Sequence, residues 1–242
     1  MKTAVMCAAF EASYDLYKRV VEAPYVAALR AFVQPGTVVV DVGANVGFFT
    51  RRFARWTGPG GRVLAIEPEQ VNFERLQRML RARHLDSTTV AVQAAAVERA
   101  GEVALAVDPH HPGGHVLAGQ GVATAGVTLD DLVETRTPGV ISLIKIDVQG
   151  AELRVLHGAA RSIALYHPAL LVELDDAALR VQGASVEMVV DFLVERGYTG
   201  HWVSSRGASA SVARDALVSG CLMRGYADVL FTQVEGPPPG AR

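Results

Sequence analysis

Apolar positions in the N-terminal part of the chain change their period once. From Tyr14 to Val33 they recur at steps of three and four, which predicts one amphipathic helix ending near Gly36. The run from Thr37 to Val40 is continuous and rich in β-branched residues, which predicts a strand buried on both faces. A helix therefore precedes the first strand of the predicted sheet.

Strands and helices alternate after this point. Apolar runs predict strands at 62–66, 88–92, 141–146 and 169–174, with a short extra strand at 102–107. Periodic stretches predict helices at 47–56 and 71–84, a short helix from Val127, a helix that Gly158 ends, and a helix from Ser185 to Gly197. The last two strands, 198–203 and 228–234, are joined by a Ser/Ala/Gly-rich segment. This order predicts an α/β fold with a doubly wound parallel sheet.

The same pattern divides the chain into three parts. Residues 1–36 are expected to form an N-terminal helical segment, residues 37–235 one domain, and residues 236–242 a disordered tail. Residues 108–121 are rich in Gly, Pro and His, which is typical of a loop over a site. We find no linker or repeat inside the domain.

Composition narrows the class of partner and the compartment. The 242 residues include 23 Lys and Arg against 25 Asp and Glu, a balance that predicts no nucleic-acid partner. Only three of the basic residues are lysines, and we interpret the arginine excess as GC-rich coding. Cys7 and Cys221 match no disulfide or metal spacing, and no apolar stretch reaches the ~18 residues of a membrane span. We expect a cytoplasmic protein without a membrane partner.

A glycine turn follows the first predicted strand and opens a helix. Its sequence runs from Asp41 to Gly47 with the spacing G-x-N-x-G, through Gly43 and Asn45. Glycines at such a turn let the backbone approach a cofactor, and asparagine is the non-glycine residue that best tolerates a positive φ. A pyrophosphate would be cradled less well here than by G-x-G-x-x-G, so the turn favours a cofactor without one.

Glu67 ends the second predicted strand, 24 residues after Gly43. A carboxylate at this place can accept both hydroxyls of an adenosine ribose. The alternative is an exposed acid that merely ends a strand.

Lys145 and Asp147 lie two residues apart on the fourth predicted strand, so their side chains point to one face of the sheet. Because ligands bind at the carboxyl ends of such strands, Asp147 is the leading catalytic candidate. A buried lysine needs a partner, but strand-mates two apart can diverge, so Asp147 is not assumed to be that partner. Lys145 is considered for a catalytic and for a structural role.

Histidines and a metal ion offer further chemistry. His110, His111 and His115 cluster in the irregular loop and could transfer a proton, although solvated loop histidines are the alternative. Asp147, with Asp175 and Asp176 after the fifth strand, could bind Mg²⁺, which would lower the pKa of an acceptor hydroxyl. Adjacent acids after a strand also cap the next helix, so the metal ligands stay unknown.

Four segments carry a family resemblance: VVVDVGANVGFFT, IEPEQVNFERLQ, VTLDDL and IKIDVQGAELRVLHGA. In order and spacing, from Val38 to Glu173, they resemble the FkbM-type S-adenosylmethionine-dependent methyltransferases. The resemblance implies a class I methyltransferase fold, Rossmann-like, with about seven strands and a reversed C-terminal strand. It also implies methylation of a hydroxyl on a sugar or secondary metabolite.

The resemblance further implies site roles and a cofactor, S-adenosyl-L-methionine. The methionine part would contact Asp41, Gly43, Asn45 and Gly47, the ribose would contact Glu67 beside Pro68, and the adenine would lie by Ala95 and Ala96. Asp147 and Glu152 would border the methyl-donor site. Gln149 stands where such families carry Glu or Gln, which implies a less acidic pocket than the glutamate form.

Three functions are therefore compared. An O-methyltransferase acting on a small-molecule acceptor is favoured. An NAD(P)-dependent oxidoreductase would have a similar glycine turn and strand-end acid. It is disfavoured because Asn45 replaces a glycine and because the C-terminal strand pair suits a methyltransferase sheet. A non-catalytic cofactor-binding or scaffolding domain is the third, because no base is unambiguous. The acceptor and the oligomeric state do not follow from the sequence.

Overall fold

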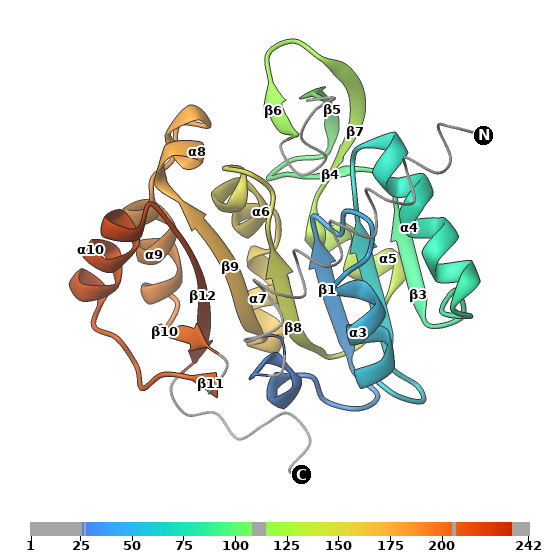
Figure 1. Cartoon of the computed structure of the whole chain (residues 1–242), viewed down its shortest axis with the longest axis horizontal. Helices are drawn as coiled ribbons and strands as arrows, with labels where there is room; N and C mark the ends of the chain where they lie inside the picture. Colours follow the sequence, from blue (N-terminus) through green and yellow to red (C-terminus); the bar gives the residue numbers. More distant parts are fainter. Residues whose placement is uncertain (1–25, 27, 108–114, 205–206, 234–242) are drawn as a thin grey trace, which may run out of the picture.

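The computed structural model describes residue 26 and residues 28–107, 115–204 and 207–233. These residues form a central eight-stranded sheet with helices on both faces, and a second, four-stranded sheet beyond one of its ends (Figure 1). The central strands are β1 (Val38–Val42), β2 (Arg62–Ile66), β3 (Thr89–Val92), β8 (Ile141–Ile146), β9 (Ala169–Asp175), β10 (Tyr198–Ser204), β11 (Gly207–Ala208) and β12 (Tyr226–Gln233).

The strand order confirms the predicted fold class. The order is β3-β2-β1-β8-β9-β12-β10-β11. From β3 to β9 all neighbours are parallel, whereas β12 runs antiparallel to both β9 and β10. The sheet is therefore doubly wound around β1 and β8, with its last long strand reversed. Within this sheet, the two-residue β11 is the strand added to the predicted seven.

Helices cover both faces and enclose two hydrophobic cores. One core lies under α3 and α4 around Phe53 and Leu76, and the other lies under the helices from α5 to α10 around Leu156 and Val189. Ser185 caps α9 as predicted, since its Oγ accepts from the Met188 N–H at 3.2 Å. The helices are η1 (Arg30–Phe32, 3₁₀), α3 (Thr50–Trp56), α4 (Gln70–Ala82), α5 (Leu129–Arg136), α6 (Glu152–Gly158), α7 (Ala160–Tyr166), α8 (Asp176–Val181), α9 (Val186–Val194) and α10 (Arg214–Arg224).

The second sheet was predicted only in part. Its strands are β4 (Ala95–Ala96), β5 (Gly101–Ala106), β6 (Val116–Ala118) and β7 (Val122–Val127), in the order β4-β7-β5-β6. The expected extra strand is β5, but the segment 108–121, expected to be irregular throughout, contains β6. Three residues show no period, and β6 forms because β5 pairs with it, for example Leu105 with Leu117. Val127 ends β7, so the helix expected to start there begins after the Thr128 cap.

Helix α10 lies in the Ser/Ala/Gly-rich segment before the last strand, where the sequence pattern predicted no helix. Leu217 and Cys221 lie one turn apart and are buried. A Cβ built on Gly220 would lie 2.7 Å from Cζ2 of Trp202, so the glycine lets the helix pack closely on β10. Small residues thus serve close packing here rather than a loop.

The ends of the chain lie mostly outside the described residues. Of the predicted N-terminal helical segment, residues 1–36, the structure describes residue 26 and residues 28–36, which include η1; the predicted tail at 236–242 lies outside the described residues. The three-part division of the chain stays a prediction.

Candidate functional site

The turn after β1 is fixed by close packing between two strand ends. Gly43 and Asn45 have φ of +74° and +49°, and both Gly43 N–H and Ala44 N–H donate to the Ile66 carbonyl at 3.0 Å. A Cβ on Gly43 would lie 1.8 Å from the backbone oxygen of Asp147. Only glycine can occupy this position without displacing the turn.

Every backbone N–H from Gly43 to Gly47 donates a hydrogen bond inside the protein. Asn45 N–H donates to Glu67 at 2.8 Å, Val46 N–H to the Asn45 side chain at 2.7 Å, and Gly47 N–H to the Ala44 carbonyl at 2.9 Å. A pyrophosphate is cradled by N–H groups that point at it. This turn therefore offers no cradle of that kind.

Glu67 is buried at the end of β2 and is held by two backbone donors. Its Oε2 accepts from Asn45 N–H and its Oε1 accepts from Glu69 N–H at 3.0 Å. Burial raises the pKa of Glu67 to about 7, against the lowering effect of these two hydrogen bonds. Each carboxylate oxygen has further acceptor capacity, so a ligand with hydroxyl donors can bind without breaking either bond.

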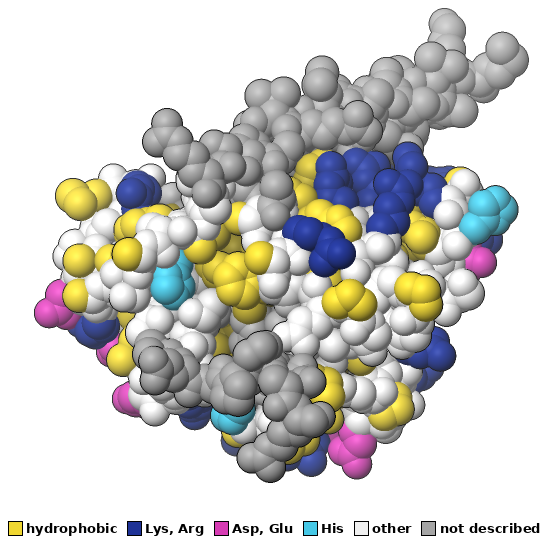
Figure 2. All heavy atoms as spheres, turned by 90° about the horizontal axis from the view of Figure 1, so that it is seen from below, with side chains coloured by type: hydrophobic (Ala, Val, Ile, Leu, Met, Phe, Trp, Pro, Cys, Tyr) yellow, Lys and Arg dark blue, Asp and Glu magenta, His cyan; other side chains and the backbone are white. Residues whose placement is uncertain are grey.

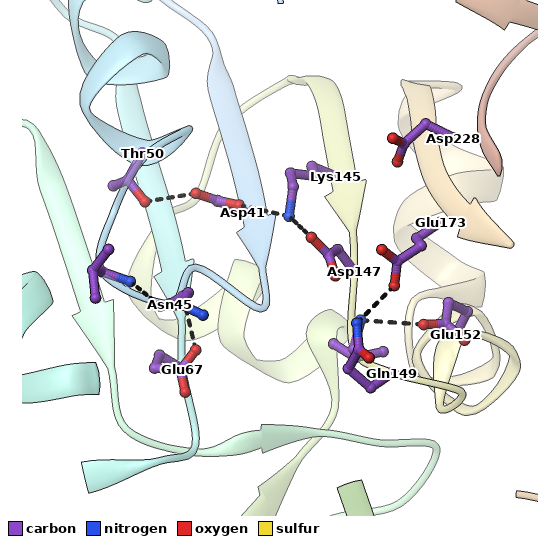
Figure 3. A network of polar contacts seen from close by, with 12 residues as sticks. Asp41, Asn45, Thr50, Glu67, Lys145, Asp147, Gln149, Glu152, Glu173 and Asp228 are labelled. Atoms are coloured by element: carbon purple, nitrogen blue, oxygen red, sulfur yellow. Dashed lines mark hydrogen bonds and ion pairs between the residues drawn. The ribbon is translucent and has the colours of Figure 1, made fainter. Parts of the chain in front are cut away.

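Lys145 joins two acids at the centre of the sheet (Figure 3). Its Nζ lies 3.0 Å from Oδ2 of Asp147 and 3.7 Å from Oδ1 of Asp41, and 4.9 Å from the centre of the Phe49 ring. Asp41 also accepts from Thr50 Oγ1 at 2.6 Å and is fully buried. Asp147 is thus a partner of the buried lysine, which the sequence left open.

The loop after β8 is held by Glu152 at the start of α6. Its Oε1 accepts from the N–H groups of Val148 and Gly150, both at 3.1 Å. The two bonds enclose Gln149, whose φ is +54°. Burial raises the pKa of Glu152 to about 7, and its Oε2 has no hydrogen-bond partner among the described residues.

Gln149 in turn donates from Nε2 to Oε2 of Glu173 at 2.9 Å. Glu173 lies near the end of β9, and β12 places Asp228 directly opposite it. Burial, then the charges of Asp147, Asp228 and Glu152, hold the pKa of Glu173 well above its usual range. Sequence reasoning missed both acids, although an acid inside the apolar run ALLVEL is a usable signal.

Most of these groups line one cavity at the carboxyl ends of β1, β2, β8 and β9. Leu105 and Leu117 of the four-stranded sheet, with His115 just before β6, close it from the other side. Nine predicted site residues line the cavity: Gly43, Asn45, Glu67, Pro68, Ala95, Ala96, His115, Lys145 and Asp147. Gln149 and Glu173 line it too. The expectation of a less acidic pocket rested on Gln149 alone, and Glu173 adds an acid that it did not include.

Three predicted residues are not among those that line the cavity. Asp41 lies beneath it against Lys145, and a Cβ on Gly47 would lie 2.2 Å from Cε of Met79, so this glycine serves the packing of α4. His111, like His110, lies outside the described residues.

The acids after β9 have local structural roles. Asp175 caps α8 by accepting from the N–H groups of Ala177 and Ala178. Asp176 accepts from Val186 N–H and pairs with Arg180 at 2.6 Å. Within the described ranges, no three His, Cys, Asp or Glu side chains are grouped so that they could hold a metal ion. Asp175 and Asp176 therefore hold the backbone at helix starts, which is the role that the sequence analysis gave as the alternative to metal binding.

Arginines are unevenly distributed over the surface. Figure 2 shows Lys and Arg side chains gathered on one part of the face seen from below. Helix α3 carries Arg51, Arg52 and Arg55 and no acid, and the Arg52 guanidinium stacks 3.9 Å above the Phe48 ring. The net charge of the whole chain is balanced, but this part of the face is basic. The absence of a nucleic-acid partner, which was inferred from the net charge, stays a prediction. Among the described helices, none has the length and apolar character needed to cross a membrane.

Comparisons with known proteins agree with this geometry. The 31-O-demethyl-FK506 methyltransferase FkbM of Streptomyces tacrolimicus is 32% identical over 160 residues, with 52% of this chain and 60% of that protein covered. Methyltransferase sdnD of Sordaria araneosa is 30% identical over 154 residues, with 50% and 59% covered. The chain thus spans about 60% of the length of these curated relatives.

A solved structure supports the fold class. Methyltransferase FkbM from Methylobacillus flagellatus KT superposes with a TM-score of 0.50 at 20% identity, with 82% of this chain and 44% of that chain covered. Residues 41–199 match the Methyltransferase FkbM domain, from β1 through the glycine turn and the loop after β8 into β10. The chain therefore belongs to the FkbM methyltransferase family.

Proposed function

We propose that this protein is an S-adenosyl-L-methionine-dependent O-methyltransferase that acts on a hydroxyl of a small molecule. The single observation that carries the choice of cofactor is the inward-bonded turn from Gly43 to Gly47, which holds no N–H free for a pyrophosphate. Against an NAD(P)-dependent oxidoreductase, this favours a cofactor that has an adenosine but no pyrophosphate.

The residues present fit such a cofactor. Glu67 would accept the ribose hydroxyls, and the small side chains of Ala95 and Ala96, beside Pro68, leave room for a flat base. Gly43 brings the turn against the end of β8, so Asn45 and Asp147 face one cavity. When bound, the cofactor would supply an electrophilic methyl group on a sulfonium. The chain would then align the acceptor oxygen with that methyl and remove its proton.

The acceptor side of the cavity lies between the ends of β8 and β9 and the four-stranded sheet. Leu105 and Leu117 give it an apolar wall, whereas His115, Gln149 and Glu173 are polar. This mixture fits a small molecule with both apolar surface and hydroxyl groups. The name of the Streptomyces tacrolimicus relative specifies methyl transfer to an oxygen of demethyl-FK506, which supports a hydroxyl acceptor. We propose a sugar or a secondary metabolite as the acceptor.

The proposal is tested with the full chain, a cofactor carrying a deuterated methyl group, and a panel of hydroxylated sugars and natural products. Mass spectrometry should detect a product that has gained one deuterated methyl in place of a hydrogen. A chain that binds the cofactor but methylates nothing in the panel would point to the non-catalytic alternative. Reduction of NAD(P) by a member of the panel would contradict the proposal.

A further inference from the structure

Glu173 has no part in the cofactor contacts described above, yet it lies on the wall of the same cavity. It follows four apolar residues of β9, and it is only 7% exposed. Within the described part of the chain, Gln149 donates a hydrogen bond to it, and the two bonds from Val148 and Gly150 to Glu152 fix the loop that carries Gln149. Figure 3 shows the carboxylate turned towards the end of β8. The group is therefore oriented and reachable from the cavity.

Burial and the acids around Glu173 hold the pKa of its carboxyl group well above the usual range. Asp147 faces it from the loop after β8, Asp228 from β12 and Glu152 from α6, whereas the Lys145 ammonium on β8 acts in the opposite direction. Asp228 is its direct cross-strand neighbour, and like charges opposite each other destabilise a sheet. A proton on Glu173 removes this repulsion.

Asp147 differs in this respect. Its Oδ2 lies 3.0 Å from the Lys145 ammonium, and a proton arriving there would compete with the ion pair. Of the loop histidines predicted to transfer a proton, His115 is the one that the structure describes, and it also lines the cavity. Of the three, only Glu173 combines burial, a fixed hydrogen-bond donor and a surplus of negative charge.

We propose that Glu173 takes the proton from the acceptor hydroxyl, and that Asp147 and Lys145 position the reacting groups. The inference rests on the proposed O-methylation. The hydroxyl proton passes to a carboxylate oxygen of Glu173 while the hydroxyl oxygen forms a bond to the methyl carbon. The bond between that carbon and sulfur breaks with its electron pair on sulfur, which becomes a neutral thioether. The protonated Glu173 then releases its proton to solvent.

A base for this step must lie within hydrogen-bond reach of the attacking oxygen, and hence close to the positive sulfur. A nearby positive charge favours the carboxylate form. Binding of S-adenosylmethionine should therefore expel a proton that binding of S-adenosylhomocysteine, whose sulfur is neutral, leaves in place. Calorimetry in two buffers of different ionisation enthalpy measures this difference without any acceptor.

The parent should release up to about one proton more with S-adenosylmethionine than with S-adenosylhomocysteine near neutral pH. Glu173→Gln should abolish the excess, and its amide oxygen can still accept from Gln149. Glu74→Gln, on the exposed part of α4, should keep the excess as a matched control. No excess in the parent, or an excess that survives in Glu173→Gln and disappears in Asp147→Asn, would overturn the assignment. A parent that binds neither compound would instead refute the proposed function.

Kinetics with the first acceptor methylated in the mass-spectrometric panel provide the second test. Glu173→Gln should lower kcat by about 10²–10⁴-fold, the range of general base catalysis. Asp228→Asn should shift the acid limb of the kcat profile to lower pH, because one repelling charge is gone. Parental kcat in Glu173→Gln, or a comparable loss in His115→Ala alone, would assign the proton to another group.

Discussion

Glu67 allows the cofactor site to be tested through its dependence on pH. Burial raises the pKa of Glu67 to about 7 in the cofactor-free protein, whereas the hydroxyls of a ribose donate to the ionised form. About nine in ten sites would be ionised at pH 8 and about one in ten at pH 6. Because only the ionised fraction binds, the affinity should fall by about tenfold over this interval.

Substitution of Glu67 by glutamine should separate the charge from the shape. The neutral amide replaces two charge-assisted hydrogen bonds by ordinary ones, a loss of about 2 kcal/mol or roughly thirtyfold in Kd at pH 8. It also has one oxygen for two donors, so its NH₂ group would face either Asn45 N–H or Glu69 N–H. The loss of affinity between pH 8 and pH 6 should become smaller, because one titrating group is gone.

Calorimetry with S-adenosylhomocysteine at pH 6, 7 and 8 measures both effects on the full chain. The exposed variant Glu74→Gln serves as the control and should follow the parent at every pH. Circular dichroism of each variant confirms that the fold is retained. Equal dissociation constants for Glu67→Gln and the parent across this range would refute the assignment of Glu67 to the ribose.

Three further changes test the physical account of the site. Gly43→Ala should lower the free energy of unfolding, measured in urea, by about 2–4 kcal/mol, because φ is +74° and the new Cβ would overlap the Asp147 carbonyl oxygen. A change of less than about 1 kcal/mol would contradict this explanation. Lys145→Met should cost about 3–5 kcal/mol by leaving the Asp41 charge buried without its cation, and adding Asp41→Asn should restore much of it. The pKa of Glu152 is raised from 4.5 to about 7, so its contribution to stability is complete below pH 4.5 and is lost as the pH rises through 7. The free energy of unfolding of the parent should therefore fall over this range, and Glu152→Gln should remove up to about 3 kcal/mol of that fall. Identical pH profiles of stability for the variant and the parent would contradict this.

The central sheet follows from the sequence because its strands are buried on both faces. Such strands are continuous apolar runs, and the predicted bounds of β8, 141–146, are those observed. The four-stranded sheet was largely missed, since β4 and β6 are too short to show a period and exist through pairing with neighbours. Helix α10 was missed because Gly220 lowers its helical signal while allowing close contact with Trp202.

The candidate site could be predicted where a residue's position after a strand decides its surroundings. Gly43, Glu67 and Asp147 all follow strands, and the topology brings them to one cavity. The significance of Glu173 depends on Gln149, 24 residues earlier, and on Asp228 across the reversed strand. Gln149, Glu173 and Asp228 share no local sequence pattern, so only the strand order reveals that Gln149 and Asp228 both lie beside Glu173.

The central claim is that this cavity binds the adenosine and methionine parts of a methyl donor rather than a dinucleotide. The most direct measurement is calorimetry of the full chain with S-adenosylhomocysteine and, separately, with NAD. The inward-bonded turn and the buried Glu67 predict that S-adenosylhomocysteine binds with one site per chain and that NAD gives no measurable heat of binding. Binding of NAD at the same site with equal or higher affinity would contradict the account.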